Sequence, residues 1–220
     1  MSDLQLITTA DGSHSLFHAQ LDETYHSKYG AIQESNHVFI NHGLQYWAEK
    51  TNRNSVSIFE VGFGTGLNAW LTYLFARRAG VRVHYHTVEA FPLPREIWMQ
   101  LNYASHDATT FSRLHEAQWD VDVEIDNTFT LRKHQGTLQE MELQGNADVI
   151  YFDAFAPGKQ PDLWAFGMLE KVCRILTASG VFVTYCARGQ LKRDLRTLTL
   201  VTETLPGPPG KKEMVRAIRK

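Results

Sequence analysis

The segment "IFEVGFGTGLN" at residues 58–68 constrains the fold more than any other, because three glycines join an apolar run to a helical pattern. A glycine-rich turn between a buried strand and a helix lets a ligand approach the backbone without meeting a Cβ atom. In α/β proteins such turns lie at the carboxyl edge of a parallel sheet, where nucleotide-like cofactors bind. The stretch therefore predicts an α/β fold with a cofactor site around residues 60–66.

The same alternation of strand and helix continues through residues 51–220, the expected main domain. We expect strands at 55–61, 81–90, 121–125, 129–134, 147–155 and 181–187, helices at 66–80, 161–180 (stopped by Gly180) and 189–199, and one or two helices within 92–118. Alternation predicts a mostly parallel, doubly wound sheet. Two final strands around a Pro/Gly loop predict a C-terminal antiparallel hairpin, typical of the methyltransferase variant of the Rossmann fold.

Residues 1–50 are expected to form an N-terminal extension that packs near the cofactor site. Asp11-Gly12 suits a two-residue turn between strands at 4–8 and 15–18, because both positions tolerate positive φ. A helix is expected over about 36–49, with Asn36 as its N-cap.

The glycine spacing separates two classes of cofactor. The dinucleotide pattern G-x-G-x-x-G would need a glycine at position 67, which is Leu67. The pattern E-x-G-x-G-x-G from Glu60 to Gly66 is instead typical of enzymes that use S-adenosylmethionine (SAM). Glu60 is expected to help hold the ammonium end of SAM, and Glu89, at the end of the next strand, to accept the ribose hydroxyls. A plain tight turn and an NAD site remain the alternatives.

The strand that ends at Asp153 predicts the reacting site. An alkylammonium has a pKa of about 10 and must lose a proton before it attacks a methyl group. The Asp153 carboxylate is expected to hold an acceptor amine and take up that proton. Phe155 and Trp164 are expected to pack on a base or on the adenine. The alternatives are helix capping for Asp153 and ordinary core packing for the two aromatic residues.

Charge is unevenly distributed although the net charge is only −2. Residues 188–220 carry nine basic and three acidic residues, a net +6, and the remainder is −8 with 13 basic and 21 acidic residues. This basic end suits a polyanion, and the alternative is a solvated surface. No apolar run of transmembrane length, no secretion signal and no metal-binding Cys or His spacing is present, so we expect a cytoplasmic protein without a metal.

Five motifs occur in order: "DGS", "YHSKYGAIQESNHVFI", "FEVGFGTGLN", "DAFAPGKQPDLW" and "GKKEM". Together, over residues 8–219, the chain resembles the methyltransferase unit of the bacterial tRNA modification enzymes of the MnmC family, which also exists as the stand-alone MnmD type. The resemblance implies SAM-dependent N-methylation of 5-aminomethyl-2-thiouridine at the wobble position of tRNA. At 220 residues the chain has no room for the FAD-dependent oxidase domain of the fused enzymes. We therefore expect no FAD, and other enzymes to supply the aminomethyl group.

The resemblance also implies roles for individual residues. The cofactor set is Glu60, Gly62, Phe63, Gly64, Thr65, Gly66, Asn68, Glu89, Gln135, Asp153, Tyr25, Ser27, Glu34 and Ser35. The set that meets the tRNA anticodon stem-loop is Phe155, Lys159, Trp164, Arg188, Lys192, Lys211 and Lys212. His134-Gln135 stands where the family has Gly-Asp, so the Gln135 carbonyl would replace the carboxylate at the adenine amine. A small-molecule amine methyltransferase and an RNA-binding module that only retains SAM remain the alternative functions.

Overall fold

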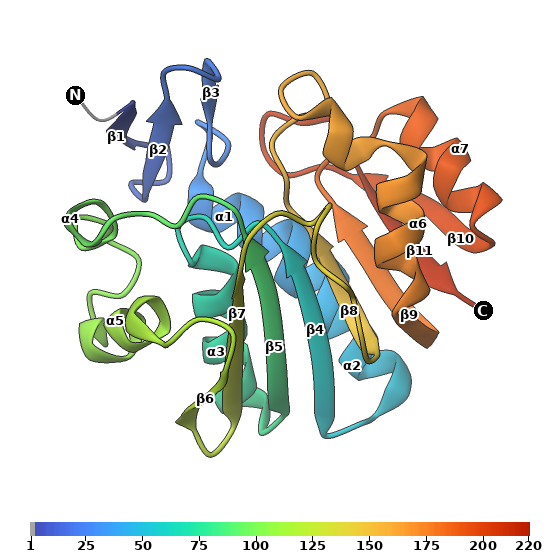
Figure 1. Cartoon of the computed structure of the whole chain (residues 1–220), viewed down its shortest axis with the longest axis horizontal. Helices are drawn as coiled ribbons and strands as arrows, with labels where there is room; N and C mark the ends of the chain where they lie inside the picture. The colour runs from blue at the N-terminus through green and yellow to red at the C-terminus, as the bar shows by residue number, and fades with distance from the viewer. Residues whose placement is uncertain (1–2) are drawn as a thin grey trace.

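The computed structural model describes residues 3–220 and contains one large mixed sheet with helices on both faces (Figure 1). Its eight strands lie in the order β10-β11-β9-β8-β4-β5-β7-β6. The strands are β4 (Ser55–Val61), β5 (Arg82–Glu89), β6 (Asp122–Asp126), β7 (Phe129–Gln135), β8 (Ala147–Phe152), β9 (Leu176–Thr184), β10 (Leu200–Pro206) and β11 (Glu213–Arg219). The Rossmann-like architecture predicted from the sequence is confirmed.

Strand direction confirms the expected doubly wound sheet and its terminal hairpin. The five central strands β9, β8, β4, β5 and β7 are parallel, and β6 pairs antiparallel with β7 at one edge. At the other edge β11 inserts antiparallel between β9 and β10. The chain leaves β4 toward β7 on one side and returns to β8 on the other. The switch point where α/β sheets bind ligands therefore lies between β4 and β8.

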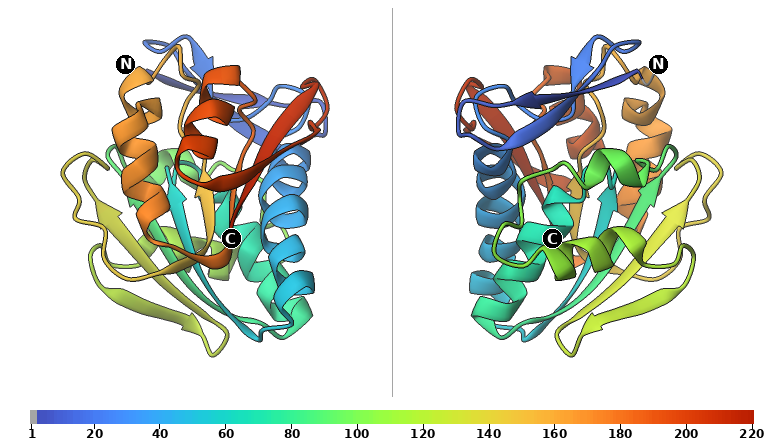
Figure 2. Two further views of the ribbon diagram at one scale, coloured as in Figure 1. Left: turned by 90° about the vertical axis from the view of Figure 1, so that its right-hand side faces the viewer. Right: turned by 90° about the vertical axis from the view of Figure 1, so that its left-hand side faces the viewer.

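The side chains of β8 show how the two layers form. All six of its residues are buried, and successive side chains point to opposite faces of the sheet. Val149 and Tyr151 join one hydrophobic core, and Ile150 and Phe152 join the other. The first core is covered by α1 (Ala31–Ser35), η1 (Asn36–Gln45), α2 (Tyr46–Thr51), α3 (Leu67–Ala79), α4 (Arg95–Trp98) and α5 (Ala108–Glu116), and the second by η2 (Pro161–Trp164), α6 (Phe166–Arg174) and α7 (Gly189–Thr197) (Figure 2).

A second, three-stranded antiparallel sheet precedes these elements. It consists of β1 (Leu4–Thr8), β2 (His14–His18) and β3 (Glu23–Thr24). Figure 1 places it beyond the carboxyl ends of the central strands, beside the loops that follow them. It therefore lies where the large sheet is expected to bind ligands.

The N-terminal hairpin turn differs from the prediction. The strands are joined by the five residues Thr9–Ser13, and only Gly12 takes a positive φ, of 82°. The Asp11 carboxylate instead accepts hydrogen bonds from Ser13 N, Thr9 Oγ1 and Gln33 N. This loop is set by a side chain that ties it to α1, which a two-residue turn could not do.

The first helix also begins earlier than predicted. Asn36 is not an N-cap, since its φ and ψ of −60° and −46° are helical, and the helical segment starts after Gly30. It continues through a π-helical stretch to Thr51. The buried residues of this stretch, including Val38, Phe39 and Leu44, pack on β8 and β9, so tertiary packing overrides the local start signal.

The expected helix 161–180 was too long. The structure has η2 and α6, and α6 ends at Arg174. Gly180 lies within β9, because Leu176 already pairs with Ala147 of β8. The pairing then shifts register, and Ser179, with φ of 61°, absorbs the irregularity before Val181 pairs with Val149. Non-local pairing with a buried strand therefore ends this helix.

Candidate active site

A cavity of about 850 Å³ lies at the carboxyl ends of the central strands. Its wall comes from seven separate parts of the chain: the N-terminal segment, the glycine turn after β4, residues 88–91, residues 136–139, residues 153–163, Tyr185 and Lys211. The volume is in the range usual for cofactor and ligand sites. The predicted switch point is thus also where the structure is hollowed.

The glycine turn is built so that only glycine fits. Gly62, Gly64 and Gly66 have φ values of 93°, 49° and 72°, all in the region that side chains disfavour. A Cβ on Gly62 would lie 3.0 Å from the Asp153 carbonyl oxygen, so β4 and β8 end in close contact. Gly62 and Gly64 line the cavity, where the lack of a Cβ lets a ligand approach the backbone.

Two histidines that the sequence did not single out contact this turn, and one of them, His26, also lines the cavity. The His115 ring lies with Nε2 3.1 Å from the Thr65 carbonyl oxygen, which can only accept, so Nε2 carries the hydrogen. His26 Nε2 lies 3.4 Å from Thr65 Oγ1. Burial lowers the pKa of His115 to about 3 and that of His26 to about 4, so both rings are neutral. No sequence spacing marks these residues, because they come from α5 and the N-terminal extension.

Phe63 of the turn is buried in an aromatic cage. It packs edge-on against His115 and Trp119, at centroid distances of 5.3 and 6.5 Å. The buried Lys133 ammonium lies over both Phe63 and Trp119 and donates to the His115 carbonyl. Burial lowers the pKa of Lys133 to about 8. Phe63 therefore anchors the turn to the sheet, and it also forms part of the cavity wall.

Two acids and one amide meet at the switch point. Asn68 Nδ2 donates to Glu60 Oε1 at 3.0 Å and to Asp153 Oδ2 at 2.8 Å. Burial, with the neighbouring Asp153 carboxylate, raises the pKa of Glu60 well above its usual value. Burial and the Glu34 charge raise the pKa of Asp153 to about 7. Within residues 3–220, Glu60 Oε2 and Asn68 Oδ1 are buried without a hydrogen-bond partner. Glu60 does not line the cavity, whereas Asn68 and Asp153 do, so their amide and carboxylate are the groups of this cluster that fit the ammonium end of SAM.

Glu89 lies at the end of β5 with its carboxylate fixed by the backbone. Oε2 accepts from Gly64 N at 2.9 Å, and Oε1 accepts from Phe91 N at 2.8 Å. Each carboxylate oxygen has a second lone pair, so two ribose hydroxyls have acceptors here. Glu89 also ties the strand end to the glycine turn.

The predicted adenine contact does not lie in the wall. Gln135 is the exposed last residue of β7, paired with Glu89, and the cavity is lined there by Gly136 and Thr137. Of the N-terminal motif, Tyr25, Ser27 and Glu34 line the cavity. Ser35 is buried within the helix.

The two predicted aromatic residues have different positions. Phe155 lines the cavity and packs edge-on against Tyr25 at 5.0 Å. Trp164 lies in the second core against Phe152, and its Nε1 donates to the Phe155 carbonyl. Trp164 thus supports the loop that carries Phe155. Its position matches the core-packing alternative.

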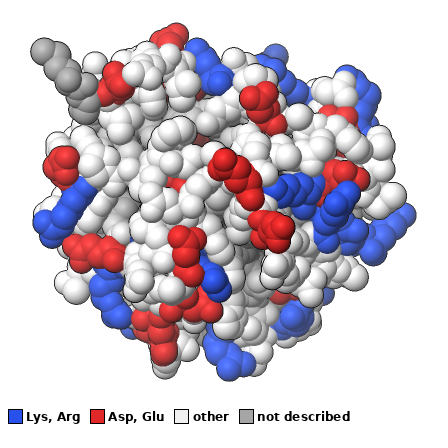
Figure 3. Space-filling model, in the orientation of Figure 1, with Lys and Arg blue, Asp and Glu red and all other residues white. Residues whose placement is uncertain are grey.

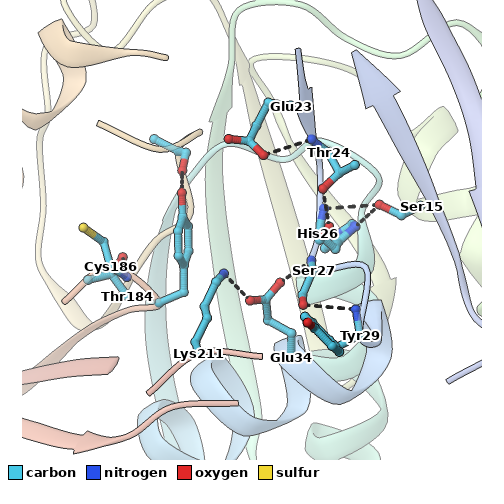
Figure 4. Close-up of polar contacts among 12 residues, drawn as sticks. Ser15, Glu23, Thr24, His26, Ser27, Tyr29, Glu34, Thr184, Cys186 and Lys211 are labelled. Atoms are coloured by element: carbon cyan, nitrogen blue, oxygen red, sulfur yellow. Dashed lines mark hydrogen bonds and ion pairs between the residues drawn. The ribbon is translucent and has the colours of Figure 1, made fainter. Parts of the chain in front are cut away.

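The predicted basic residues are also divided. Lys211 lines the cavity and pairs with Glu34 (Figure 4), Lys159 lines it and lies 3.8 Å from Asp22, and Lys192 pairs with Glu213 at 2.9 Å. Lys212 is exposed, and Arg188 directly precedes α7. In Figure 3 many lysine and arginine side chains gather on the side where Figure 1 places α7 and the C-terminal strands.

The sheet order, the glycine turn and the acids at the strand ends define a Rossmann-type methyltransferase that uses SAM. The chain belongs to the family described as S-adenosyl-L-methionine-dependent methyltransferase, whose profile matches residues 102–220, and within it to the MnmC methyltransferase-domain proteins. Among residues 3–220, no group of three or more His, Cys, Asp or Glu side chains is arranged to hold a metal. Nor does any helix in that range have the length and apolar character needed to cross a bilayer.

Two curated relatives show the similarity in sequence. Both are named tRNA 5-methylaminomethyl-2-thiouridine biosynthesis bifunctional protein MnmC. The protein from Chromobacterium violaceum is 29% identical over 210 residues, covering 89% of this chain and 32% of its own. The protein from Ralstonia nicotianae is 31% identical over 217 residues, covering 91% and 32%. The chain therefore spans about a third of the length of these relatives.

Solved structures show the similarity in fold. The crystal structure of MNMC2 from Aquifex aeolicus matches with a TM-score of 0.82 at 25% identity, over 100% of this chain and 71% of that one. SAM-bound CalS10, an amino pentose methyltransferase from Micromonospora echinaspora, matches with a TM-score of 0.51 at 10% identity, over 80% of this chain and 88% of that one. The second match supports the fold alone.

Proposed function

We propose that this chain methylates the amine of 5-aminomethyl-(2-thio)uridine at the wobble position of tRNA. The observation that carries the proposal is the position of Asp153, a carboxylate with a raised pKa in the same cavity as the glycine turn. The names of the MnmC relatives support tRNA as the acceptor. On this proposal the glycine turn and Glu89 hold SAM, and Asp153 faces the amine.

Bound SAM would supply a methyl group on a positively charged sulfur. The work of the protein is to bring up an amine nitrogen with a free lone pair, since an alkylammonium has a pKa of about 10. With the pKa of Asp153 at about 7, moving a proton from that ammonium to Asp153 costs about 4 kcal/mol. For an ordinary aspartate the same transfer would cost about 8 kcal/mol. Burial of Asp153 therefore makes it a better proton acceptor.

The wall around Asp153 suits a flat base that carries a charged arm. Tyr25 and Phe155 present rings at the same end of the cavity, and Glu34 adds a carboxylate. Exposed basic side chains of α7, such as Arg193 and Arg196, are then available to the phosphates of an RNA.

The test is transfer of a labelled methyl group from SAM to tRNA. The acceptors are tRNA from cells that lack this gene, which carries the unmethylated amine, and an unmodified transcript of the same tRNA. We expect label on the first only. Label on the unmodified transcript would exclude the amine as acceptor. SAM binding without label on either would favour an RNA-binding module, and label only on free amines a small-molecule methyltransferase.

A further inference from the structure

Lys211 lines the same cavity as Glu34 and Asp153, and its side chain is 33% exposed. Its ammonium forms an ion pair with Glu34 and sits 3.9 Å from the centroid of the Tyr185 ring. The Tyr185 hydroxyl donates to the carbonyl of Ala154, the residue after Asp153. Lys211 comes from the loop between β10 and β11, and Glu34 from α1, so the pair joins opposite ends of the chain.

The Glu34 carboxylate is held from both sides. Its Oε1 receives the Lys211 ammonium, and its Oε2 accepts a hydrogen bond from Ser27 N at 2.7 Å. The loop that carries Lys211 is itself docked on the N-terminal segment. His37 Nε2 donates to the Pro206 carbonyl at 2.9 Å, and Gly210 lies against the Tyr29 ring so closely that a Cβ would meet it at 2.1 Å. The ion pair therefore has a fixed place in the wall.

Asp153 is faced by charged or titratable groups from five other elements. Glu60 approaches from β4, Tyr85 from β5, Glu34 from α1, Tyr185 from the end of β9, and Lys211 from the β10–β11 loop. Glu34 disfavours the carboxylate form of Asp153, whereas Lys211 favours it. Lys211 is thus a cation set among three acids at one end of the cavity.

We propose that Lys211 is a positioning residue for the acceptor site. Lys211 fixes Glu34 beside Asp153 and balances the negative charge of Glu34. It does not contact a tRNA phosphate. The kinetic test of this inference rests on the proposed function. The ammonium of Lys211 keeps Glu34 from acting as a second, competing negative charge. Asp153 then remains the carboxylate that meets the acceptor amine.

Opposite shifts in the pH profile test the proposal. Lys211→Met removes a positive charge and should move the acid limb of kcat to higher pH by about one unit, which is about a tenfold loss below the limb. Glu34→Gln removes a negative charge and should move the limb to lower pH. The double variant should return toward the wild-type limb, and Lys211→Arg should leave the limb in place.

The neighbouring exposed residue gives a matched control. Lys212→Met should leave the limb unchanged, and should raise KM for tRNA with a salt slope reduced by about 0.7 to 0.9. Lys211→Met should leave that slope unchanged. A Lys211→Met enzyme that loses salt dependence and keeps its pH limb would overturn the proposal, since Lys211 would then be a phosphate contact.

A measurement without substrate separates this inference from the proposed function. Titration of the Asp153 carboxyl by carbon NMR in protein labelled at the aspartate carboxyl groups, assigned with Asp153→Asn, gives its pKa directly. The pKa should rise in Lys211→Met and fall in Glu34→Gln. Unchanged values in both would overturn the inference even if tRNA is methylated. Shifts of these signs support it even if the wild-type protein methylates no tRNA, which would refute the proposed function alone.

Discussion

Asp153 and Glu60 are single residues whose roles depend on their surroundings. The sequence places both at the ends of apolar strands, so their meeting at the sheet edge could be predicted. Asn68, which donates to both, was expected only as a cofactor contact. The influence of Glu34 on Asp153 could not be predicted, because it depends on how α1 packs against the large sheet.

Replacing Asp153 by asparagine should remove the proton acceptor and keep the side-chain shape. We expect kcat for methylation to fall by about 10² to 10⁴, the usual range for loss of a general base. Asn68 can still donate to the new amide oxygen, so the fold should survive. Steady-state assays with aminomethylated tRNA check this, and a fully active Asp153→Asn enzyme would show that another group takes the proton.

The same substitution should stabilise the free protein above neutral pH. The pKa of Asp153 is about 7 in the fold against a usual value of 3.8, so the folded state binds the extra proton and stability falls as pH rises between these values. Asp153→Asn should therefore raise the free energy of unfolding at pH 8, by at most about 4 kcal/mol. No gain is expected at pH 3.5.

Urea unfolding at the two pH values measures this difference. Asp162→Asn, an exposed residue of the same segment, is the control and should change little at either pH. Equal effects of Asp153→Asn at pH 3.5 and pH 8 would contradict the raised pKa.

At the scale of elements, the turn after β4 was predictable because strand, turn and helix are all local. The start of the first helix and the end of α6 were not. The first helix is positioned by packing on β8 and β9, which lie far away in sequence. The end of α6 is decided by the pairing of Leu176 with Ala147 of β8, a strand that precedes the helix. The local capping signals at Asn36 and Gly180 do not set the helix ends, because the burial of apolar side chains in the core outweighs them.

Replacing each of two glycines by alanine distinguishes the effect of backbone strain from the effect of a close contact with another segment. Gly62 and Gly145 have similar φ values of 93° and 85°, but only at Gly62 would a Cβ meet backbone, the Asp153 carbonyl at 3.0 Å. Gly62→Ala should raise the Kd for SAM, measured by calorimetry, at least tenfold. It should also lower the melting temperature more than Gly145→Ala does. Gly145→Ala should lower the free energy of unfolding by about 1 kcal/mol, the cost of backbone strain, and should leave the Kd for SAM unchanged. Equal SAM affinities in the two variants would contradict the assigned role of the turn.

At the scale of the whole molecule, the cavity is made by segments that the sequence shows far apart. Lys211 and Glu34 are 177 positions apart and meet in the cavity wall. The family resemblance predicted the general location of the site, and the SAM-dependent family assignment is confirmed. It did not separate the basic residues that line the cavity from those on the surface, because charge patterns carry no information on which side chains are paired.

The basic side of the molecule yields a prediction about RNA. Arg193 and Arg196 are exposed on α7, and Arg78 is exposed on α3, which covers the other face of the sheet. Arg193→Glu with Arg196→Glu should weaken tRNA binding and reduce its salt dependence, by a slope of about 0.9 for each phosphate that the protein no longer neutralises. Fluorescence anisotropy over a salt series measures both. Arg78→Glu should leave the salt slope unchanged, and an equal effect of that variant would contradict a binding face around α7.

Nucleoside mass spectrometry of tRNA from a strain that lacks this gene tests the proposed methylation of a tRNA wobble amine. We expect 5-aminomethyl-2-thiouridine to accumulate and its N-methyl derivative to disappear, with reversal by the wild-type gene and not by the Asp153→Asn form. Unchanged levels of both nucleosides would contradict it.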